Sequence, residues 1–238
     1  MKGDTALAAR VRQSFMDEAG LTADLSHPNI IKVLDIAETP DGMPYFVMPH
    51  LSSSLAVRVW PLHLQSFLKT PVAERHIEPI DPVETARFLQ GLLSALSVVH
   101  EAGIVHRDVK PNNILIDDRG SPILCDFGMA LLASGESVTW RKRFGAPPFV
   151  NPEQLIDLAL VGRQADVYSV GVIAYLMLTG RPPDASHTPP NRYIPGLDEK
   201  LNDIMMHLIE PAATGRPRDA SQALDLLKSA ASRNMQLT

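Results

Sequence analysis

Side chains that could transfer a phosphoryl group gather within residues 106–128. Asp108, Lys110 and Asn113 precede a short apolar run, and Asp126 follows a second one. Both runs have strand length and are joined by turn residues, so we expect a hairpin that brings the four side chains to one end of a small sheet. There an acid could orient an attacking hydroxyl, an acid and an amide could hold Mg²⁺, and a lysine could neutralise phosphoryl charge.

The two runs, Ile114–Ile116 and Ile123–Cys125, flank a turn at residues 117–120. The whole stretch resembles the catalytic loop and the Mg²⁺-binding loop of protein kinases. The motif H-R-D-x-x-x-x-N begins at His106, and D-F-G begins at Asp126, 13 residues after the first motif ends. Two motifs in the right order and spacing make this resemblance far more specific than a lone D-F-G.

The resemblance implies a role for each polar side chain. Asp108 would position the substrate hydroxyl and accept its proton, while Lys110 would steady the γ-phosphoryl group of ATP. Asn113 and Asp126 would bind Mg²⁺. A lysine two residues after the aspartate is typical of serine/threonine rather than tyrosine kinases. The stretches P-P-F-V-N-P-E-Q and L-T-G-R-P-P are similar to those of bacterial Hanks-type kinases.

A first helix is predicted between residues 4 and 25, and its inward face carries an acid. The stripe at helical spacing consists of Val11, Phe15, Glu18, Thr22 and Leu25. A buried carboxylate needs a cationic partner. By the kinase resemblance, this partner is the lysine that holds the ATP phosphates, and Lys2 is the one lysine upstream of Glu18. We therefore expect a Lys2–Glu18 pair; the alternative is a solvated terminal lysine.

Two short strands are predicted at residues 30–36 and 45–48. The H-P-N-I sequence before them resembles the turn after the kinase C helix. By the same resemblance, Met48 would be the gatekeeper behind the adenine pocket, or simply fill the core. Proline lacks an N–H, so the hinge would use the Pro49 carbonyl and the Leu51 amide. The positions assigned to the nucleotide are Lys2, Glu18, Met48, Pro49, Leu51 and Leu115.

The start of a long helix is marked at Asp81. Asp81 can cap the helix, Pro82 suits its first turn, Glu84 can close a capping box, and Gly103 ends it. A shorter helix is expected over residues 60–69.

Three further charges would support the fold. The resemblance implies that Glu153, in N-P-E, pairs with Arg216 in a buried contact. It also implies that Asp166 begins a central helix and accepts hydrogen bonds from the backbone of the catalytic loop.

The stretch from Met129 to Val150 reads as a kinase activation segment. It contains three hydroxyl residues that could be phosphorylated, namely Ser134, Ser137 and Thr139. Arg107, beside the catalytic aspartate, could capture a phosphate on this segment and order it.

Several positions depart from the family pattern. No G-x-G-x-x-G occurs near the N-terminus, so the chain resembles a kinase domain that begins at its third strand, either as a fragment or by natural truncation. The glycine-rich loop covers ATP with backbone N–H groups, and we expect weak ATP binding and poor turnover without it. Ala146 stands where a positioning hydroxyl is usual, and Thr22 replaces a usual leucine.

Composition narrows the class of protein. The chain has 238 residues, of which 45% are hydrophobic, so it can bury a large core. A net charge of −5 argues against binding to nucleic acid, because the phosphate backbone attracts a basic surface. The single cysteine, Cys125, excludes an internal disulfide and suits a reducing compartment. No apolar run is long enough to span a membrane, and the N-terminus is not a signal peptide, so we expect a cytoplasmic location.

We therefore predict an α+β, protein-kinase-like bilobal fold. Residues 1–51 would form a small, incomplete, β-rich N-lobe, 52–228 a large, mainly α-helical C-lobe, and 229–238 a tail. The predicted function is a serine/threonine protein kinase domain that uses ATP and Mg²⁺ on a protein substrate. One alternative is a pseudokinase that acts as a binding or regulatory module. A remoter one is a small-molecule phosphotransferase.

Overall fold

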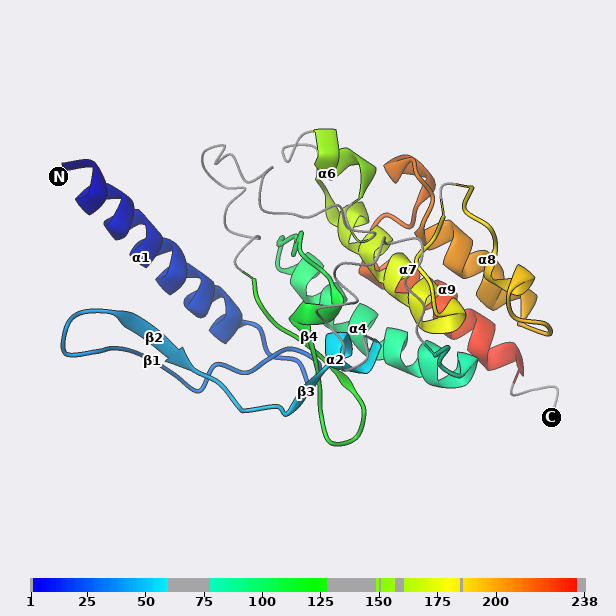
Figure 1. The fold of residues 1–238 in the computed structure, drawn as a ribbon, viewed down its shortest axis with the longest axis horizontal. Helices are drawn as coiled ribbons and strands as arrows, with labels where there is room; N and C mark the ends of the chain where they lie inside the picture. The colour runs from blue at the N-terminus through cyan, green and yellow to red at the C-terminus, as the bar shows by residue number, and fades with distance from the viewer. Residues whose placement is uncertain are drawn as a thin grey trace.

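The computed structural model describes residues 2–59, 78–127, 149, 151–156, 161–184 and 186–234. It has the predicted α+β architecture in two unequal parts. A long N-terminal helix and a β-hairpin project from one side of a larger, mainly helical part, and the two chain termini lie at opposite ends of the molecule (Figure 1). Between the two parts lies a small three-stranded sheet.

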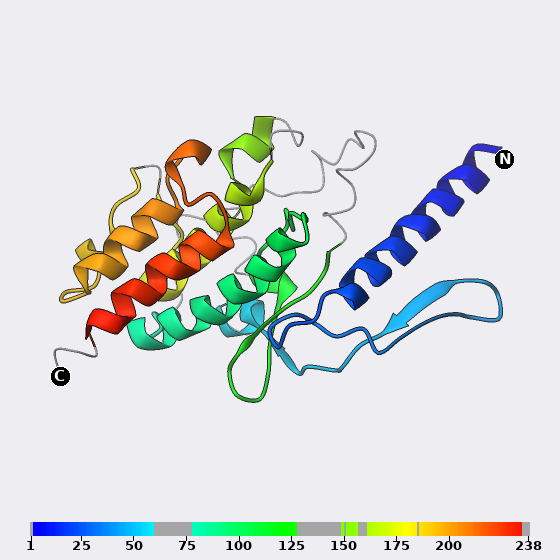
Figure 2. The ribbon, with the colours of Figure 1, turned by 180° about the vertical axis from the view of Figure 1, so that it is seen from behind.

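The small N-terminal part consists of α1 (Lys2–Asp24) and an antiparallel hairpin of β1 (Asp35–Glu38) and β2 (Pro44–Val47). The rings of Phe15 on α1 and Phe46 on β2 lie 5.3 Å apart, and this contact joins helix to hairpin. Both elements point away from the helical part (Figure 2). The hairpin was predicted, but its first strand begins at residue 35 rather than 30.

The reason for this shift lies in residues 29–31. The Ile31 N–H donates to the Leu124 carbonyl at 2.9 Å, and the Leu124 N–H donates to the Asn29 carbonyl at 2.8 Å. Ile30 and Ile31 are 5% and 3% exposed. These two apolar side chains are therefore buried where the chain crosses the three-stranded sheet, and the hairpin starts after them.

The three-stranded sheet has the order β3 (Ser53–Ser54), β4 (Ile114–Ile116), β5 (Pro122–Leu124), and both pairings are antiparallel. The β4–β5 hairpin confirms the strands predicted around the turn at residues 117–120. Directly after β3 comes α2 (Leu55–Val59), and the 3₁₀ turn η2 (Pro111–Asn113) leads into β4. The helix predicted over residues 60–69 lies outside the described residues.

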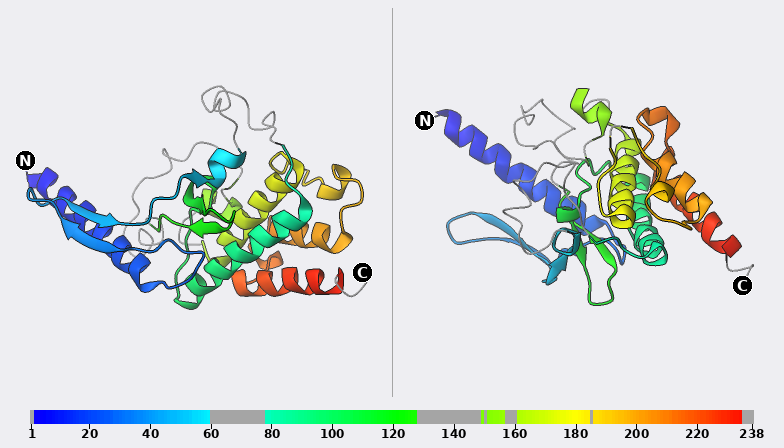
Figure 3. Two further views of the ribbon diagram at one scale, coloured as in Figure 1. Left: turned by 90° about the horizontal axis from the view of Figure 1, so that it is seen from below. Right: turned by 45° about the vertical axis from the view of Figure 1, so that its right-hand side comes forward.

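The large part is built around α7 (Arg163–Thr179), whose side chains are buried from Ala165 to Thr179. A helix that is buried all round forms the centre of a core. The surrounding elements are α4 (Pro82–Glu101), α6 (Pro152–Ile156), η5 (Pro190–Arg192), α8 (Glu199–Leu208), η6 (Ala213–Gly215) and α9 (Ala220–Asn234). The helix α4 packs against both α7 and α9 (Figure 3).

Local signals explain where α4 begins and ends. The Asp81 carboxylate accepts hydrogen bonds from the N–H groups of Val83 and Glu84, which confirms the predicted cap. The Glu84 carboxylate pairs with Arg58 instead of closing a capping box. Gly103 follows the helix with a φ of 79°, a left-handed conformation that favours glycine. Within the part of the chain that the structure describes, no helix is both long and apolar enough to cross a membrane.

Candidate active site

Three of the four predicted chemical side chains are in direct contact. The Lys110 Nζ donates to Asp108 Oδ2 at 2.6 Å, and the Asn113 Nδ2 donates to the same oxygen at 2.9 Å. The Asn113 amide also donates to the Asp108 backbone carbonyl at 3.0 Å. The Asp108 side chain is 14% exposed and that of Lys110 is 33% exposed, so this carboxylate–ammonium contact is partly accessible to solvent.

The fourth side chain, Asp126, lies beside this cluster. The Cys125 N–H donates to the Asn113 carbonyl at 3.0 Å, which continues the β4–β5 ladder by one residue and brings Asp126 next to Asn113. Asp126 is exposed and has a φ of 65°. The next side chain, Phe127, is fully buried, and its ring lies 4.8 Å from that of His106. The turn thus buries Phe127 and leaves the acid at the surface.

These residues fit a divalent cation that is shared with a ligand. The Asn113 Nδ2 is committed to Asp108, so its Oδ1 is the end of the amide available to a metal, and Asp126 adds a carboxylate. Oxygen ligands of this kind suit Mg²⁺, which keeps few protein ligands and takes the rest from phosphates and water. Among the described residues, no group of three or more His, Cys, Asp or Glu side chains could hold a metal without such help.

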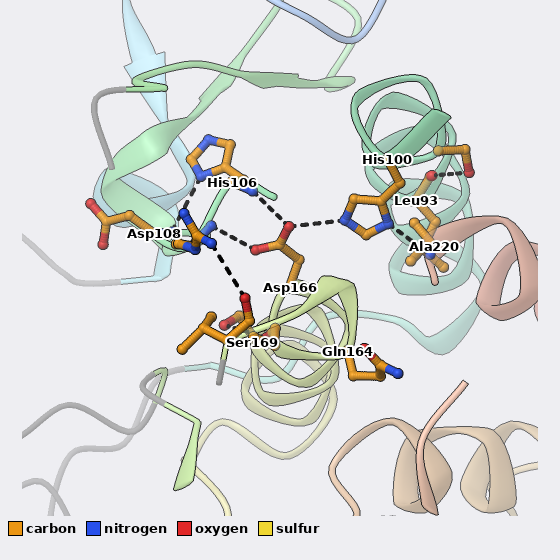
Figure 4. A network of polar contacts seen from close by, with 12 residues as sticks. Leu93, His100, His106, Asp108, Gln164, Asp166, Ser169 and Ala220 are labelled. Carbon is orange, nitrogen blue, oxygen red and sulfur yellow. Dashed lines mark hydrogen bonds and ion pairs between the residues drawn. The ribbon is translucent and has the colours of Figure 1, made fainter. Parts of the chain in front are cut away.

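Asp166 accepts hydrogen bonds from the backbone of the catalytic loop, as predicted. The N–H groups of His106 and Arg107 donate to its two carboxylate oxygens, each at 2.8 Å. The Asp166 side chain is 1% exposed and projects from the first turn of α7 toward the loop (Figure 4). A buried carboxylate that accepts backbone N–H groups fixes the path of the loop directly before Asp108.

A histidine that no sequence motif had indicated completes this network. The His100 Nε2 lies 2.9 Å from Asp166 Oδ2, and the Ala220 N–H, at the start of α9, donates to His100 Nδ1 at 3.1 Å (Figure 4). Because a backbone N–H can only donate, Nδ1 accepts and the ring proton of the neutral imidazole is on Nε2. His100 therefore links α4, α7 and α9 beneath the catalytic loop. Both partners are far from His100 in the sequence, so no local sequence pattern indicates these contacts.

Arg107 has an unusual backbone and a partly buried side chain. Its φ is 65°, and its guanidinium Nη2 lies 3.5 Å from the Val161 carbonyl. Burial lowers the pKa of Arg107, while the nearby Asp166 carboxylate opposes that shift. Arg107 was predicted to bind a phosphate on the activation segment. The three candidate residues, Ser134, Ser137 and Thr139, lie outside the described residues, as does Ala146.

The predicted pair of Glu153 and Arg216 is confirmed. The Arg216 guanidinium donates to both carboxylate oxygens, at 2.7 and 3.0 Å, and its side chain is fully buried. It also donates to the carbonyls of Glu210, Gln164 and Pro211 and stacks on the Tyr168 ring. The pair fastens α6 to the large helical part.

The Glu18 carboxylate is half-buried on α1. Burial raises the pKa of the Cys125 thiol to about 12, and the carboxylates of Asp126 and Glu18 add to that rise. The neighbouring Thr22 is 5% exposed, and its hydroxyl donates to the Glu18 carbonyl at 2.8 Å, so the hydroxyl in this buried stripe is satisfied.

The predicted Lys2–Glu18 pair is wrong for this structure. Lys2 is the first residue of α1, and Glu18 lies 16 residues later in the same continuous helix. A helix rises about 1.5 Å per residue, so the two backbones are about 24 Å apart. Lysine and glutamate side chains cannot close that distance. One continuous helix therefore holds the two residues apart.

The remaining positions predicted to contact the nucleotide lie on the segment between β2 and β3 and on β4. Met48 is 46% exposed, so the expectation that it fills the core is wrong: it follows β2 on a hairpin that does not enter the core. Pro49 is exposed, and Leu51 and Leu115 are half-buried. Leu115 pairs with Ser54 across β3–β4 and faces away from the buried Ile114 and Ile116, as alternation along a strand requires.

Comparison with known proteins agrees with the motifs. The family model described as "Protein kinase domain" matches residues 4–237. The chain is 31% identical over 219 residues to the DNA damage-responsive serine/threonine-protein kinase RqkA of Deinococcus radiodurans, with 90% of this chain and 28% of that protein covered. It is 34% identical over 187 residues to PknK of Mycobacterium tuberculosis, covering 74% of this chain and 16% of that protein.

A third relative is serine/threonine-protein kinase PrkC of Bacillus subtilis, 31% identical over 170 residues, with 71% of this chain and 24% of that protein covered. The chain thus spans less than a third of the length of each of these relatives. The family model nevertheless covers nearly all of the chain, and the catalytic-loop contacts lie within it. The chain belongs to the protein kinase family, as a domain of the bacterial serine/threonine type.

Proposed function

We propose that this domain transfers the γ-phosphoryl group of ATP to serine and threonine hydroxyls of a protein substrate, with Mg²⁺ as cofactor. One observation carries the proposal. The Asp108 carboxylate is oriented by both Lys110 and Asn113 at 2.6 and 2.9 Å. Phosphoryl transfer depends mainly on positioning of the reactants and on charge stabilisation. An oriented carboxylate would position the attacking hydroxyl.

The roles follow from which atoms are already committed. Both contacts use Asp108 Oδ2, so we assign Oδ1 to the substrate hydroxyl and its proton. The Lys110 ammonium would neutralise charge on the phosphoryl group in transfer. The Asn113 Oδ1 and the Asp126 carboxylate would hold Mg²⁺, which would neutralise the phosphate oxygens when bound. The left-handed turn at Asp126 supports this, because it aims the acid outward beside Asn113.

We assign the adenine of ATP to the segment that connects β2 to β3, where Pro49 and Leu51 would supply hinge contacts. Leu115 and Met48 would then line the pocket, and Glu18 would face the phosphates. We place the boundary between the small and large parts after residue 51; of the predicted division into residues 1–51, 52–228 and 229–238, the last boundary falls inside α9, which continues to Asn234. We also propose that the domain works in the cytoplasm, where ATP is abundant and Cys125 stays reduced.

A phosphotransfer assay tests the proposal. The chain is incubated with γ-labelled ATP, Mg²⁺ and a generic substrate such as myelin basic protein, and the label on serine and threonine is measured. Replacing Asp108 with Asn keeps the shape but removes the proton acceptor, and we expect a loss of about 10²–10⁴-fold. Asp118→Asn changes an exposed acid in the β4–β5 turn and is the matched control.

Equal labelling by wild type and Asp108→Asn would overturn the assignment of Asp108. A chain that binds nucleotide without transferring label would instead be a pseudokinase. Transfer to small metabolites but not to protein would favour the small-molecule phosphotransferase.

A further inference from the structure

We propose that Gln154 is a positioning residue that fixes the peptide between Arg107 and the catalytic Asp108. This inference rests on the proposed function for its kinetic consequence. Gln154 lies in the short helix α6, directly after the Glu153 that Arg216 anchors. Its Nε2 donates to the Arg107 carbonyl at 3.1 Å, although the two residues are 47 positions apart in the sequence.

A relay of three hydrogen bonds sets the orientation of this amide. The Gln154 backbone N–H can only donate, and it donates to Asn151 Oδ1 at 2.9 Å. The Asn151 Nδ2 must then face the other way, and it donates to Gln154 Oε1 at 3.1 Å. Gln154 is therefore left with its Nε2 toward the Arg107 carbonyl. Asn151 is 1% exposed, so the relay is shielded from water.

The carbonyl that receives this bond belongs to a peptide in an unfavourable conformation. Arg107 has a φ of 65°, a left-handed conformation that is unfavourable for a residue with a side chain. Its N–H is held by Asp166 Oδ1 at 2.8 Å, and the Asp108 N–H lies 3.3 Å from His106 Nδ1. The Gln154 bond holds the opposite side of the Arg107–Asp108 peptide, so the peptide cannot turn without breaking a contact.

The anchor behind Gln154 is rigid. Arg216 grips Glu153 with both guanidinium nitrogens, and the Ser169 hydroxyl donates to the Phe149 carbonyl at 2.9 Å just before α6. Gln154 therefore connects a helix fixed to α7 and η6 with the backbone of the catalytic aspartate. We infer that the position of α6 is transmitted to Asp108 through the Gln154 side-chain amide.

Two substitutions at Gln154 separate positioning from folding. Gln154→Met keeps the length and removes the donor. Gln154→Glu keeps the acceptor for Asn151 but turns an oxygen toward the Arg107 carbonyl. We expect kcat to fall about tenfold for Met, the equivalent of about 1.4 kcal/mol, and further for Glu, with KM for ATP and Tm close to wild type. Gln222→Glu is the matched control, because Gln222 Oε1 only accepts, from the Arg218 N–H, and a carboxylate can do the same.

Wild-type kcat in both Gln154 variants would overturn the proposal. So would a fall in Tm that accounts for the whole loss of activity, because that would show a purely structural role. Hydrogen exchange of the Asp108 amide gives a readout that needs no activity: it should accelerate severalfold in Gln154→Met and stay unchanged in Gln222→Glu. An inactive wild type would refute the proposed function, whereas an unchanged Asp108 exchange rate in Gln154→Met would refute the positioning role.

Discussion

The catalytic loop and the N-terminal hairpin are supported in opposite ways. The loop rests on buried polar contacts: Asp166, 1% exposed, holds two of its N–H groups and is itself held by His100, 2% exposed. The β1–β2 hairpin contacts α1 through the half-buried pair of Phe15 and Phe46. Its other face leaves large apolar side chains at the surface, namely Tyr45 at 42% and Val47 at 40% exposure.

This difference matches the two tasks that the family combines. Phosphoryl transfer needs an acid fixed to within a fraction of an ångström, and a fully satisfied buried network provides such rigidity. Nucleotide entry and release need a part that moves, and elements with few buried contacts open at low free-energy cost. We therefore expect the chain to respond very differently to substitutions in its two parts.

The largest effect on stability is expected at Arg216. Arg216→Ala leaves Glu153 without its partner in a largely buried site, at a cost of about 3–5 kcal/mol in the free energy of unfolding. For a chain of this size each kcal/mol lowers Tm by about 2–4 °C, which scanning calorimetry resolves. Arg218→Ala, two residues away at a side chain 76% exposed, is the control and should change little. Equal shifts in both variants would contradict the buried anchor.

A smaller effect is expected in the hairpin. Phe46→Ala removes the ring contact with Phe15, worth about 1 kcal/mol beyond the lost burial. Because the hairpin lies outside the main core, this variant should loosen the hairpin locally more than it lowers the global Tm. Tyr45→Ala, on the exposed face of the same strand, serves as the comparison. The two-part account would fail if Phe46→Ala unfolded the helical part as Arg216→Ala does.

The smallest effect concerns pH at the junction of the two parts. The His27 Nδ1 accepts the Asn29 N–H at 3.0 Å, and its Nε2 lies 3.0 Å from the Ser94 hydroxyl on α4. Burial lowers the pKa of His27 from its ordinary value of 6.5. Stability from the neutral ring is therefore present above about pH 6.5 and is lost as the pH falls, because the unfolded chain takes up the proton more readily.

The measurement is the change in Tm between pH 7.5 and 5.5 for wild type and for His27→Gln. Wild type should lose slightly more stability than the variant over this range. An identical loss in both chains would show that His27 does not titrate with folding.

The structural features that were predicted correctly are those in which a short sequence motif is compatible with one structure. Asp81 before a proline marked the start of α4, and the pattern of two apolar runs around a turn gave β4 and β5. Glu153, Arg216 and Asp166 were assigned through the motifs around them, and their contacts match that assignment. In each case the local sequence and the tertiary contact favour the same structure.

Prediction from the sequence failed where the partner is distant or where two local structures compete. No local pattern marks His100 or Gln154, because the hydrogen bond of His100 joins two helices, and that of Gln154 joins α6 to the catalytic loop, over long separations in the sequence. Lys2 was paired with Glu18 through the kinase resemblance, whereas the residues between them form one uninterrupted helix. Ile30 and Ile31 have strand propensity, but burial against β5 outweighs hairpin pairing.

Native-state hydrogen exchange tests the central claim most directly, namely that the buried Asp166 network sets the catalytic loop before any ligand binds. We predict that the amides of His106 and Arg107 exchange nearly as slowly as those in the middle of α7, whereas the amides of β1 and β2 exchange orders of magnitude faster. Asp166→Asn should speed exchange at both loop amides. Loop amides that exchange as fast as the hairpin in the wild-type chain would contradict the claim.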